Sequence, residues 1–111
     1  MPLRALARSQ WQSYVDRVSA ALGAQRVEIE ATGLGLDSPE PTDWIALTGI
    51  RFDPENDLLA IKLDGFEHTV RDPTRVCIDH DFDWLHSIEV FDAEGNHHIL
   101  LLKAPLPLTS P

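Results

Sequence analysis

Carboxylate and imidazole side chains are most concentrated between residues 79 and 86. Asp79, Asp81 and Asp83 alternate there with His80, and His86 follows shortly afterwards. Carboxylate oxygens suit calcium or magnesium, whereas imidazole nitrogens suit zinc and similar metals. The segment therefore has the donor types of a metal site, and an actual site would require the fold to bring these donors to one point.

The spacing of these acids is like the opening of an EF-hand calcium loop, but the rest of that loop is missing. An EF-hand needs glycine at its sixth position and glutamate at its twelfth, and this chain has Trp84 and Val90 there. We therefore exclude an EF-hand, interpret the segment as a solvated acidic turn with surface histidines, and expect no metal and no other cofactor. The ligands, if a metal did bind, would be Asp79, Asp81, Asp83 and His86.

A transition-metal site would need a further imidazole from the next strand, and His97 and His98 are the candidates. In a hairpin His98 would lie near Phe91, whereas His86 would lie at the far end of the same pair of strands. The pattern does not favour a site that joins them.

The sequence offers no convincing nucleophile. Cys77 is the single cysteine, and the carboxylates near it disfavour a reactive thiolate, so we interpret it as structural. Ser87 follows His86 directly, but neighbours along a strand point to opposite faces and cannot act as a pair. We expect His68 to be a partly buried histidine, assign no catalytic residue, and regard enzymatic activity as the less favoured interpretation.

Trp84 differs from the other aromatic residues because it lies within the acidic turn rather than at a core position. Two roles stay open for it. It can anchor a contact with a partner, or it can cover one end of the sheet.

Strands supply most of the elements that would position these residues. Two segments share one pattern, in which a β-rich run is interrupted by a turn cluster, at 53–57 and at 92–96, and then resumes. Both are predicted hairpins, because Pro fixes φ, Gly supplies positive φ, and Asp or Asn bonds its own turn backbone. The predicted strands are 26–31, 44–52, 58–63, 66–71, 75–79, 85–91 and 97–103.

One helix is predicted near the start of the chain. Ser9 and Gln12 have the spacing of a capping box, and Gly23 stands where a C-cap glycine would end the helix. An apolar stripe predicts the face that docks on the sheet, and Gln12, Asp16 and Ser19 are expected on the opposite face. The stripe consists of Trp11, Val15, Val18 and Leu22.

These elements predict an α+β fold that is mostly β, with one N-terminal helix packed on an antiparallel meander of six or seven strands. Because most connections are short, sequence neighbours should be spatial neighbours, and a strongly curled sheet or a small open barrel would protect the edges. The 111 residues are expected to form a single domain, with 1–8 and 104–111 as loose ends. Thr32–Asp43 is predicted to be the longest loop.

The charge is unevenly distributed along the chain. Residues 1–26 carry four arginines and one aspartate, for a charge of +3, and residues 27–111 carry five basic and seventeen acidic side chains, for −12, which together give −9. So acidic a body disfavours nucleic acid as a partner. No apolar run is long enough to span a membrane, and we expect a cytoplasmic protein, as a monomer or homodimer.

Four segments, 9–14 (SQWQSY), 16–19 (DRVS), 26–30 (RVEIE) and 44–57, carry a resemblance that runs over nearly the whole chain. The chain resembles the bacterial family of unknown function DUF5335, which implies a one-domain bacterial protein without an assigned activity. Residues 50–93 are also similar to the short β domains of the DUF2283 family, although 79–84 lacks the glycine common in their turns. Neither resemblance supplies catalytic residues.

The pattern favours a non-catalytic binding or regulatory module with an unidentified protein partner, which the acidic surface would allow to be basic. Two alternatives stay open. One is a homo-oligomeric structural protein that pairs through an edge strand. The other is a metal-dependent activity at the turn from Asp79 to His86.

Overall fold

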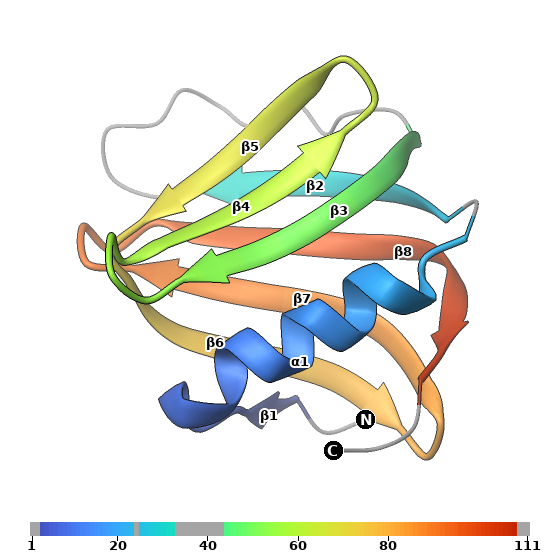
Figure 1. Cartoon of the computed structure of the whole chain (residues 1–111), viewed down its shortest axis with the longest axis horizontal. Coiled ribbons are helices and arrows are strands. Elements are labelled where there is room, and N and C mark those ends of the chain that lie inside the picture. The colour runs from blue at the N-terminus through green and yellow to red at the C-terminus, as the bar shows by residue number, and fades with distance from the viewer. Residues whose placement is uncertain (1–2, 24, 33–43, 109–111) are drawn as a thin grey trace.

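The computed structural model describes residues 3–23, 25–32 and 44–108 (Figure 1). These residues form one helix and eight strands, which pair as one antiparallel sheet in the order β1-β6-β7-β8-β2-β3-β4-β5. The prediction of one helix on an antiparallel sheet is confirmed, with one or two more strands than expected. The elements are β1 (Arg4–Ala5), α1 (Arg8–Ala21), β2 (Arg26–Thr32), β3 (Ile45–Asp53), β4 (Leu58–Leu63), β5 (Phe66–Arg71), β6 (Pro73–Asp81), β7 (Trp84–Asp92) and β8 (His97–Pro107).

The sheet curls strongly but does not close into a barrel. β3 pairs with β2 only through Ala46 with Arg26 and Ile45 with Val27. Beyond this corner, β3, β4 and β5 turn over β8 and β7, and α1 lies across the remaining opening, where it packs on β3 and reaches β6 (Figure 1). The expectation of a curled sheet is therefore confirmed, with a helix filling the side that stays open.

The helix begins earlier than the capping prediction. Its N-cap is Ala7, which makes no side-chain cap, so Ser9 lies inside the first turn and the predicted capping box does not form. Tertiary contacts fix the start instead: the amide of Leu6 donates to the carbonyl of Val76, and Trp11 Nε1 donates to the carbonyl of Leu6 over 3.1 Å. The end agrees with the prediction, since Gly23 follows the helix with φ +55°.

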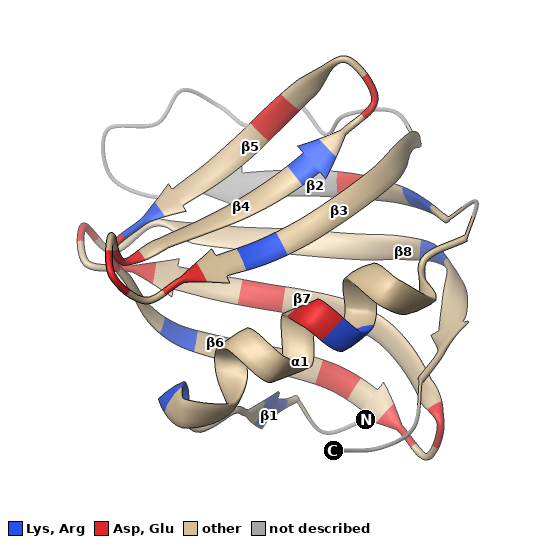
Figure 2. Ribbon diagram, in the orientation of Figure 1, with Lys and Arg blue, Asp and Glu red and all other residues tan. Residues whose placement is uncertain are grey.

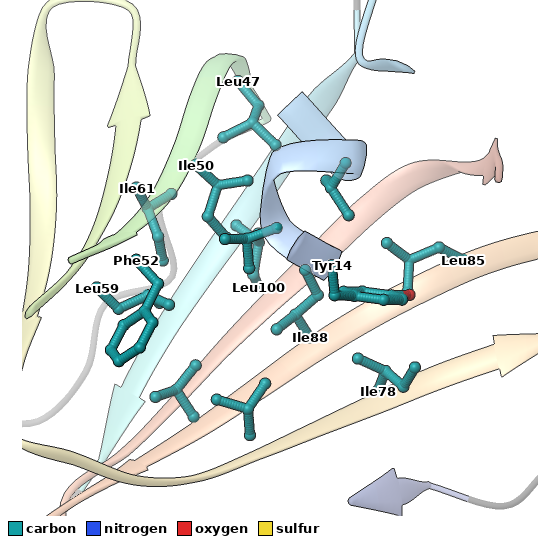
Figure 3. Close-up of a cluster of buried hydrophobic side chains, with 14 of the residues drawn as sticks. Tyr14, Leu47, Ile50, Phe52, Leu59, Ile61, Ile78, Leu85, Ile88 and Leu100 are labelled. Atoms are coloured by element: carbon teal, nitrogen blue, oxygen red, sulfur yellow. The ribbon is translucent and has the colours of Figure 1, made fainter. Parts of the chain in front are cut away.

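The buried face of α1 is the predicted one, with the addition of Tyr14. Trp11, Val15, Val18 and Leu22 are all buried, and Val15 and Val18 are inaccessible to solvent. Ser19, expected on the outward face, instead bonds to Ile50 of β3. The core that α1 completes is drawn from α1 and from the inner faces of all strands from β2 to β8, and Figure 3 shows part of it. Its labelled members are Tyr14, Leu47, Ile50, Phe52, Leu59, Ile61, Ile78, Leu85, Ile88 and Leu100.

The two ends of the described chain differ from the expected loose segments. Residues 4 and 5 form β1, which pairs with Ile78 and Cys77 on the edge of β6. At the other end β8 continues to Pro107, four residues past the predicted strand, and Leu106 and Leu108 are buried. The predicted loop at 32–43 begins with Thr32 as the last residue of β2, and residues 33–43 lie outside the described chain. Within the described residues, no helix has the length and apolar character that crossing a membrane requires.

Candidate functional site

The predicted acidic turn is a tight hairpin between β6 and β7. Asp81 pairs with Trp84, so Phe82 and Asp83 form a two-residue loop. The connection expected over residues 80–84 is therefore reduced to residues 82 and 83, because β6 ends at Asp81 and β7 begins at Trp84. We call residues 81–84 the hairpin tip. Its backbone is held from the C-terminal side, because the amide of Leu108 donates to the carbonyl of Asp83 over 2.8 Å and Trp84 pairs with β8.

Two aromatic side chains project from the hairpin tip. Phe82 is 83% exposed and Trp84 is 49% exposed. Phe82 also has φ +53°, a backbone conformation that is uncommon for a bulky residue and natural for glycine or asparagine. The sequence left two roles open for Trp84, a contact anchor or a cover for the end of the sheet, and its side chain is about half exposed. Phe82 was not predicted, because the loop contains no glycine or asparagine to signal positive φ.

The candidate metal ligands do not converge. The described residues contain no group of three or more His, Cys, Asp or Glu side chains that could hold a metal ion. Asp79 stands opposite Ser87 in the register of β6 and β7, while Asp81 and Asp83 lie in the hairpin tip. One oxygen of Asp79, Oδ1, is buried without a hydrogen-bond partner in the described part of the chain.

His80 connects three parts of the fold through its two ring nitrogens. Its Nε2 lies 3.0 Å from the carbonyl oxygen of Leu108, and its Nδ1 lies 2.8 Å from the hydroxyl of Tyr14. A carbonyl can only accept, so Nε2 carries a proton and, in the neutral ring, Tyr14 donates to Nδ1. Burial raises the pKa of Tyr14 far above its usual range, and the charges of Arg17 and Arg4 only partly oppose this effect. Tyr14 is therefore a neutral donor that helps to fix β6 behind the hairpin tip.

The two histidines of β8 lie on opposite faces of the sheet. His97, and not His98 as expected, stands opposite Phe91. The rings of His97 and Phe91 stack with their centroids 4.2 Å apart, and His97 Nε2 lies 2.6 Å from Glu89 Oε1. This shift of one residue turns His98 to the inner face, because side chains alternate along a strand.

A chain of hydrogen bonds on the inner side joins His98 to β5 and to the turn after β7. His68 Nε2 lies 2.9 Å from His98 Nδ1, and His98 Nε2 lies 3.0 Å from Asp92 Oδ2. The side chains of His98 and Asp92 are each 9% exposed. His68 is half-buried, as the sequence predicted. We call Asp92, His98 and His68 the histidine staple.

Asp92 belongs to one of the two hairpins with a shared sequence pattern, and the structure confirms that likeness. Asp92 Oδ1 accepts from the amides of Glu94 and Asn96, just as Asp53 Oδ1 accepts from those of Glu55 and Asn56. The two turns differ in their surroundings, since Asp53 is solvated and Asp92 is buried against His98. The sequence contained a signal for this contact, because Asp92 and His98 lie six residues apart on either side of a predicted hairpin turn.

The environments of these residues change their pKa values. Burial raises the pKa of Asp92, but hydrogen bonds from His98, Asn96 and Glu94 outweigh it and hold that pKa below its usual range. The hydrogen bond from the Asn56 side chain is the main cause of a lowered pKa at Asp53. Burial, with a smaller contribution from His98, lowers the pKa of His68. His68 is therefore neutral at neutral pH.

Acidic side chains gather in the turns at the ends of the sheet, including the hairpin tip, and others lie along β5, β6 and β7, whereas the basic side chains are spread over the strands and α1 (Figure 2). Arg75, a sequence neighbour of the acidic turn, lies over the ring of Phe91, with 5.8 Å between its Cζ and the ring centroid. The hairpin tip thus combines exposed aromatic rings with the carboxylates of Asp81 and Asp83.

These features define a class of protein: a small α+β domain made of one open, curled antiparallel sheet with a helix across its opening. The family described as "Family of unknown function (DUF5335)" matches residues 3–111, and the chain belongs to this family, as the sequence predicted. The chain is also similar to an uncharacterized protein of Aquifex aeolicus, with 28% identity over 109 residues that cover 97% of this chain and 98% of that protein. No solved structure matches it.

Proposed function

We propose that this protein is a non-catalytic binding module that contacts a basic protein partner through its hairpin tip. The observation that carries this proposal is Phe82, whose side chain is 83% exposed while its backbone has φ +53°. Strained backbone conformations of this kind occur preferentially at functional sites.

The backbone conformation at Phe82 is costly for its residue type. A left-handed conformation costs an L-residue on the order of 1–2 kcal/mol, and a glycine would avoid this cost. A ring that is 83% exposed recovers little of it by burial. An aromatic side chain at this position gains most when it is covered by a second molecule.

Trp84 adds a second aromatic surface next to the first. It begins β7, pairs with Asp81 and Pro107, and is 49% exposed. Tryptophan and other rigid aromatic residues are frequent at the energetic centres of protein interfaces. Because both neighbouring strands hold its backbone, little conformational entropy would be lost when a partner binds.

The charge of the hairpin tip favours a basic partner. Asp81 and Asp83 flank Phe82, and the chain as a whole carries a net charge of −9. Complementary charges accelerate association and select against acidic partners. The binding of a basic segment should therefore weaken as the salt concentration rises.

Site-specific photocrosslinking in the source organism tests the proposal. A benzoylphenylalanine at position 84 should form an adduct with a discrete partner, and one at position 66 serves as the control. Phe66 is 46% exposed but lies on β5, at the opposite edge of the sheet from the β6–β7 side. The partner is then purified, and its affinity for the full chain is measured by calorimetry at two salt concentrations.

The expected result is a salt-dependent affinity that falls at least about tenfold in Trp84→Ala and in Asp81→Asn/Asp83→Asn, but not in Phe66→Ala. Equal adducts from positions 84 and 66, or affinity unchanged by the hairpin-tip variants, would contradict the proposal. Adducts between two copies of this chain from position 66 alone would instead favour the homo-oligomer that pairs through an edge strand.

A further inference from the structure

The histidine staple connects parts of the sheet that are far apart in strand order. β5 is the last strand of the sheet, and β8 is separated from it by β2, β3 and β4. The curl of the sheet nevertheless brings His68 of β5 within 2.9 Å of His98 of β8. The staple therefore joins β5, which belongs to the part of the sheet that turns over, to β8 in the part beneath it.

The hydrogen bonds determine where the protons of the staple lie. Asp92 is an acceptor, because its pKa is low and its other partners are amides. His98 therefore donates through Nε2 and, when neutral, accepts at Nδ1. His68 fills that position by donating through Nε2. In the state with both rings neutral, each of the two hydrogen bonds has one proton.

The staple can take up one additional proton without losing a hydrogen bond. That proton can bind His68 at Nδ1, which is outside the chain of bonds. It can also reside on His98, which then donates at both nitrogens while His68 accepts at Nε2. A second additional proton makes both rings cationic, so that two N–H groups face each other where the nitrogens are 2.9 Å apart.

We propose that the histidine staple is a pH-sensitive switch, in which binding of the second proton breaks the bond between His68 and His98 and releases β5 from β8. Asp92 is the one carboxylate of the staple, and it stabilises one cation but not two. The neighbours in register are apolar: Ile61 of β4 stands opposite His68, and Val90 of β7 stands opposite His98. On β2, the position paired with His98 is Ala31.

The other charged groups near this end of the sheet have separate partners. Arg8 at the start of α1 pairs with Asp57 in the turn between β3 and β4. Glu89 binds His97 on the other face of β7 and β8. Neither pair contributes a hydrogen bond to the staple, so the second cation has no carboxylate of its own among the described residues.

The direction of the pH dependence follows from His68. Because burial lowers its pKa, His68 in the native staple takes up a proton at a lower pH than an unfolded histidine, whose pKa is about 6.5. The open state therefore binds more protons as the pH falls below this value, and the closed state loses stability. At neutral pH and above, the staple stays closed.

His80 provides an internal comparison. A proton added at its Nδ1 would be donated to the hydroxyl oxygen of Tyr14, and Nε2 would still donate to the carbonyl of Leu108. Both of its hydrogen bonds survive protonation. We therefore expect acid to loosen β5 and to leave the contact between α1 and β6 intact.

Hydrogen exchange of the full chain between pH 8 and pH 5 tests the switch. After correction for intrinsic exchange, opening of the β5 amides should increase by up to tenfold per pH unit below about pH 6.5. The variant His68→Gln keeps a donor for His98 but does not titrate, so its β5 protection should not change with pH. The control is His86→Gln, a half-buried histidine of β7 outside the staple, which should behave as the wild type does.

The proposal fails if β5 protection in the wild type is independent of pH, or if His68→Gln keeps the dependence of the wild type. Nitrogen-15 NMR of the histidine rings gives a second measurement that needs no variant. The expected spectrum at pH 8 has both rings protonated at Nε2, with His98 Nδ1 as the acceptor of the bond from His68. A spectrum in which either ring lacks the proton at Nε2 at pH 8 would overturn the switch even if His68→Gln did not fold.

Discussion

The hydroxyl of Ser19 in α1 bonds to both backbone groups of Ile50 in β3. It donates to the carbonyl oxygen over 2.5 Å and accepts from the amide nitrogen over 2.8 Å. At this point β3 has already separated from β2, so a neighbouring strand is not available on that side. The helix thus satisfies a strand edge that would otherwise be buried without partners.

Replacing Ser19 with Ala should therefore destabilise the fold. The change leaves a part-buried amide and a part-buried carbonyl without partners, which we expect to cost about 1–3 kcal/mol. Chemical denaturation followed by circular dichroism measures the loss. The matched control is Ser13→Ala, because Ser13 is exposed and bonds only to the helix carbonyl of Gln10. Equal effects of the two substitutions would show that the contact with Ile50 contributes nothing.

Glycine substitutions at the two loop positions of the hairpin tip should have opposite effects on stability. Phe82→Gly removes a left-handed L-residue and should stabilise the fold by about 1 kcal/mol. Asp83 is not among the residues with positive φ. Asp83→Gly should therefore destabilise the fold by about 0.5–1 kcal/mol, because glycine gives the unfolded chain more conformational freedom. Thermal melts of both variants give the comparison. Destabilisation by Phe82→Gly would remove the argument that Phe82 is retained for contact.

Asp92→Asn should destabilise more than the matched change Asp53→Asn in the other hairpin. The buried Asp92 carboxylate accepts from His98 and Asn96, and we expect its loss to cost about 1–3 kcal/mol at pH 7. Since the pKa of Asp92 is lower in the native state, this contribution is present at neutral pH. It is lost as the pH falls from about 3.9 through the native pKa. Denaturation curves at pH 7 and pH 3 test this. If Asp92→Asn lowered the free energy of unfolding by the same amount at pH 7 and at pH 3, this prediction would be contradicted.

Added calcium, magnesium, manganese or zinc should leave the melting temperature unchanged. The described residues form no group of metal-binding side chains, and a ligand stabilises a protein only if it binds the native state. Scanning calorimetry before and after addition of a chelator measures the effect. A rise in melting temperature that disappears in Asp81→Asn or His86→Ala would promote the acidic turn to a metal site.

Local sequence patterns determined the elements of this protein. The stripe of Trp11, Val15, Val18 and Leu22 predicted the buried face of α1, because four apolar side chains on one face of a helix have to be removed from water. Turn chemistry predicted the hairpins at Asp53 and Asp92, since an Asp side chain that bonds the amides after it acts within a few residues. Both signals depend on neighbours along the chain, which a single sequence contains.

Only the tertiary structure decided which side chains meet. The helical pattern placed Ser19 on the outward face, but Ser19 bonds to β3 where that strand has separated from β2. Ser9 does not cap the helix, because the bond between Leu6 and Val76 fixes an earlier start. His68 and His98 come from strands at opposite sides of the β2 corner and meet because the sheet curls. Phe82 acquires its strained backbone from the register of Asp81 with Trp84. Curl and register arise from packing the whole inner face at once, and no local pattern encodes them.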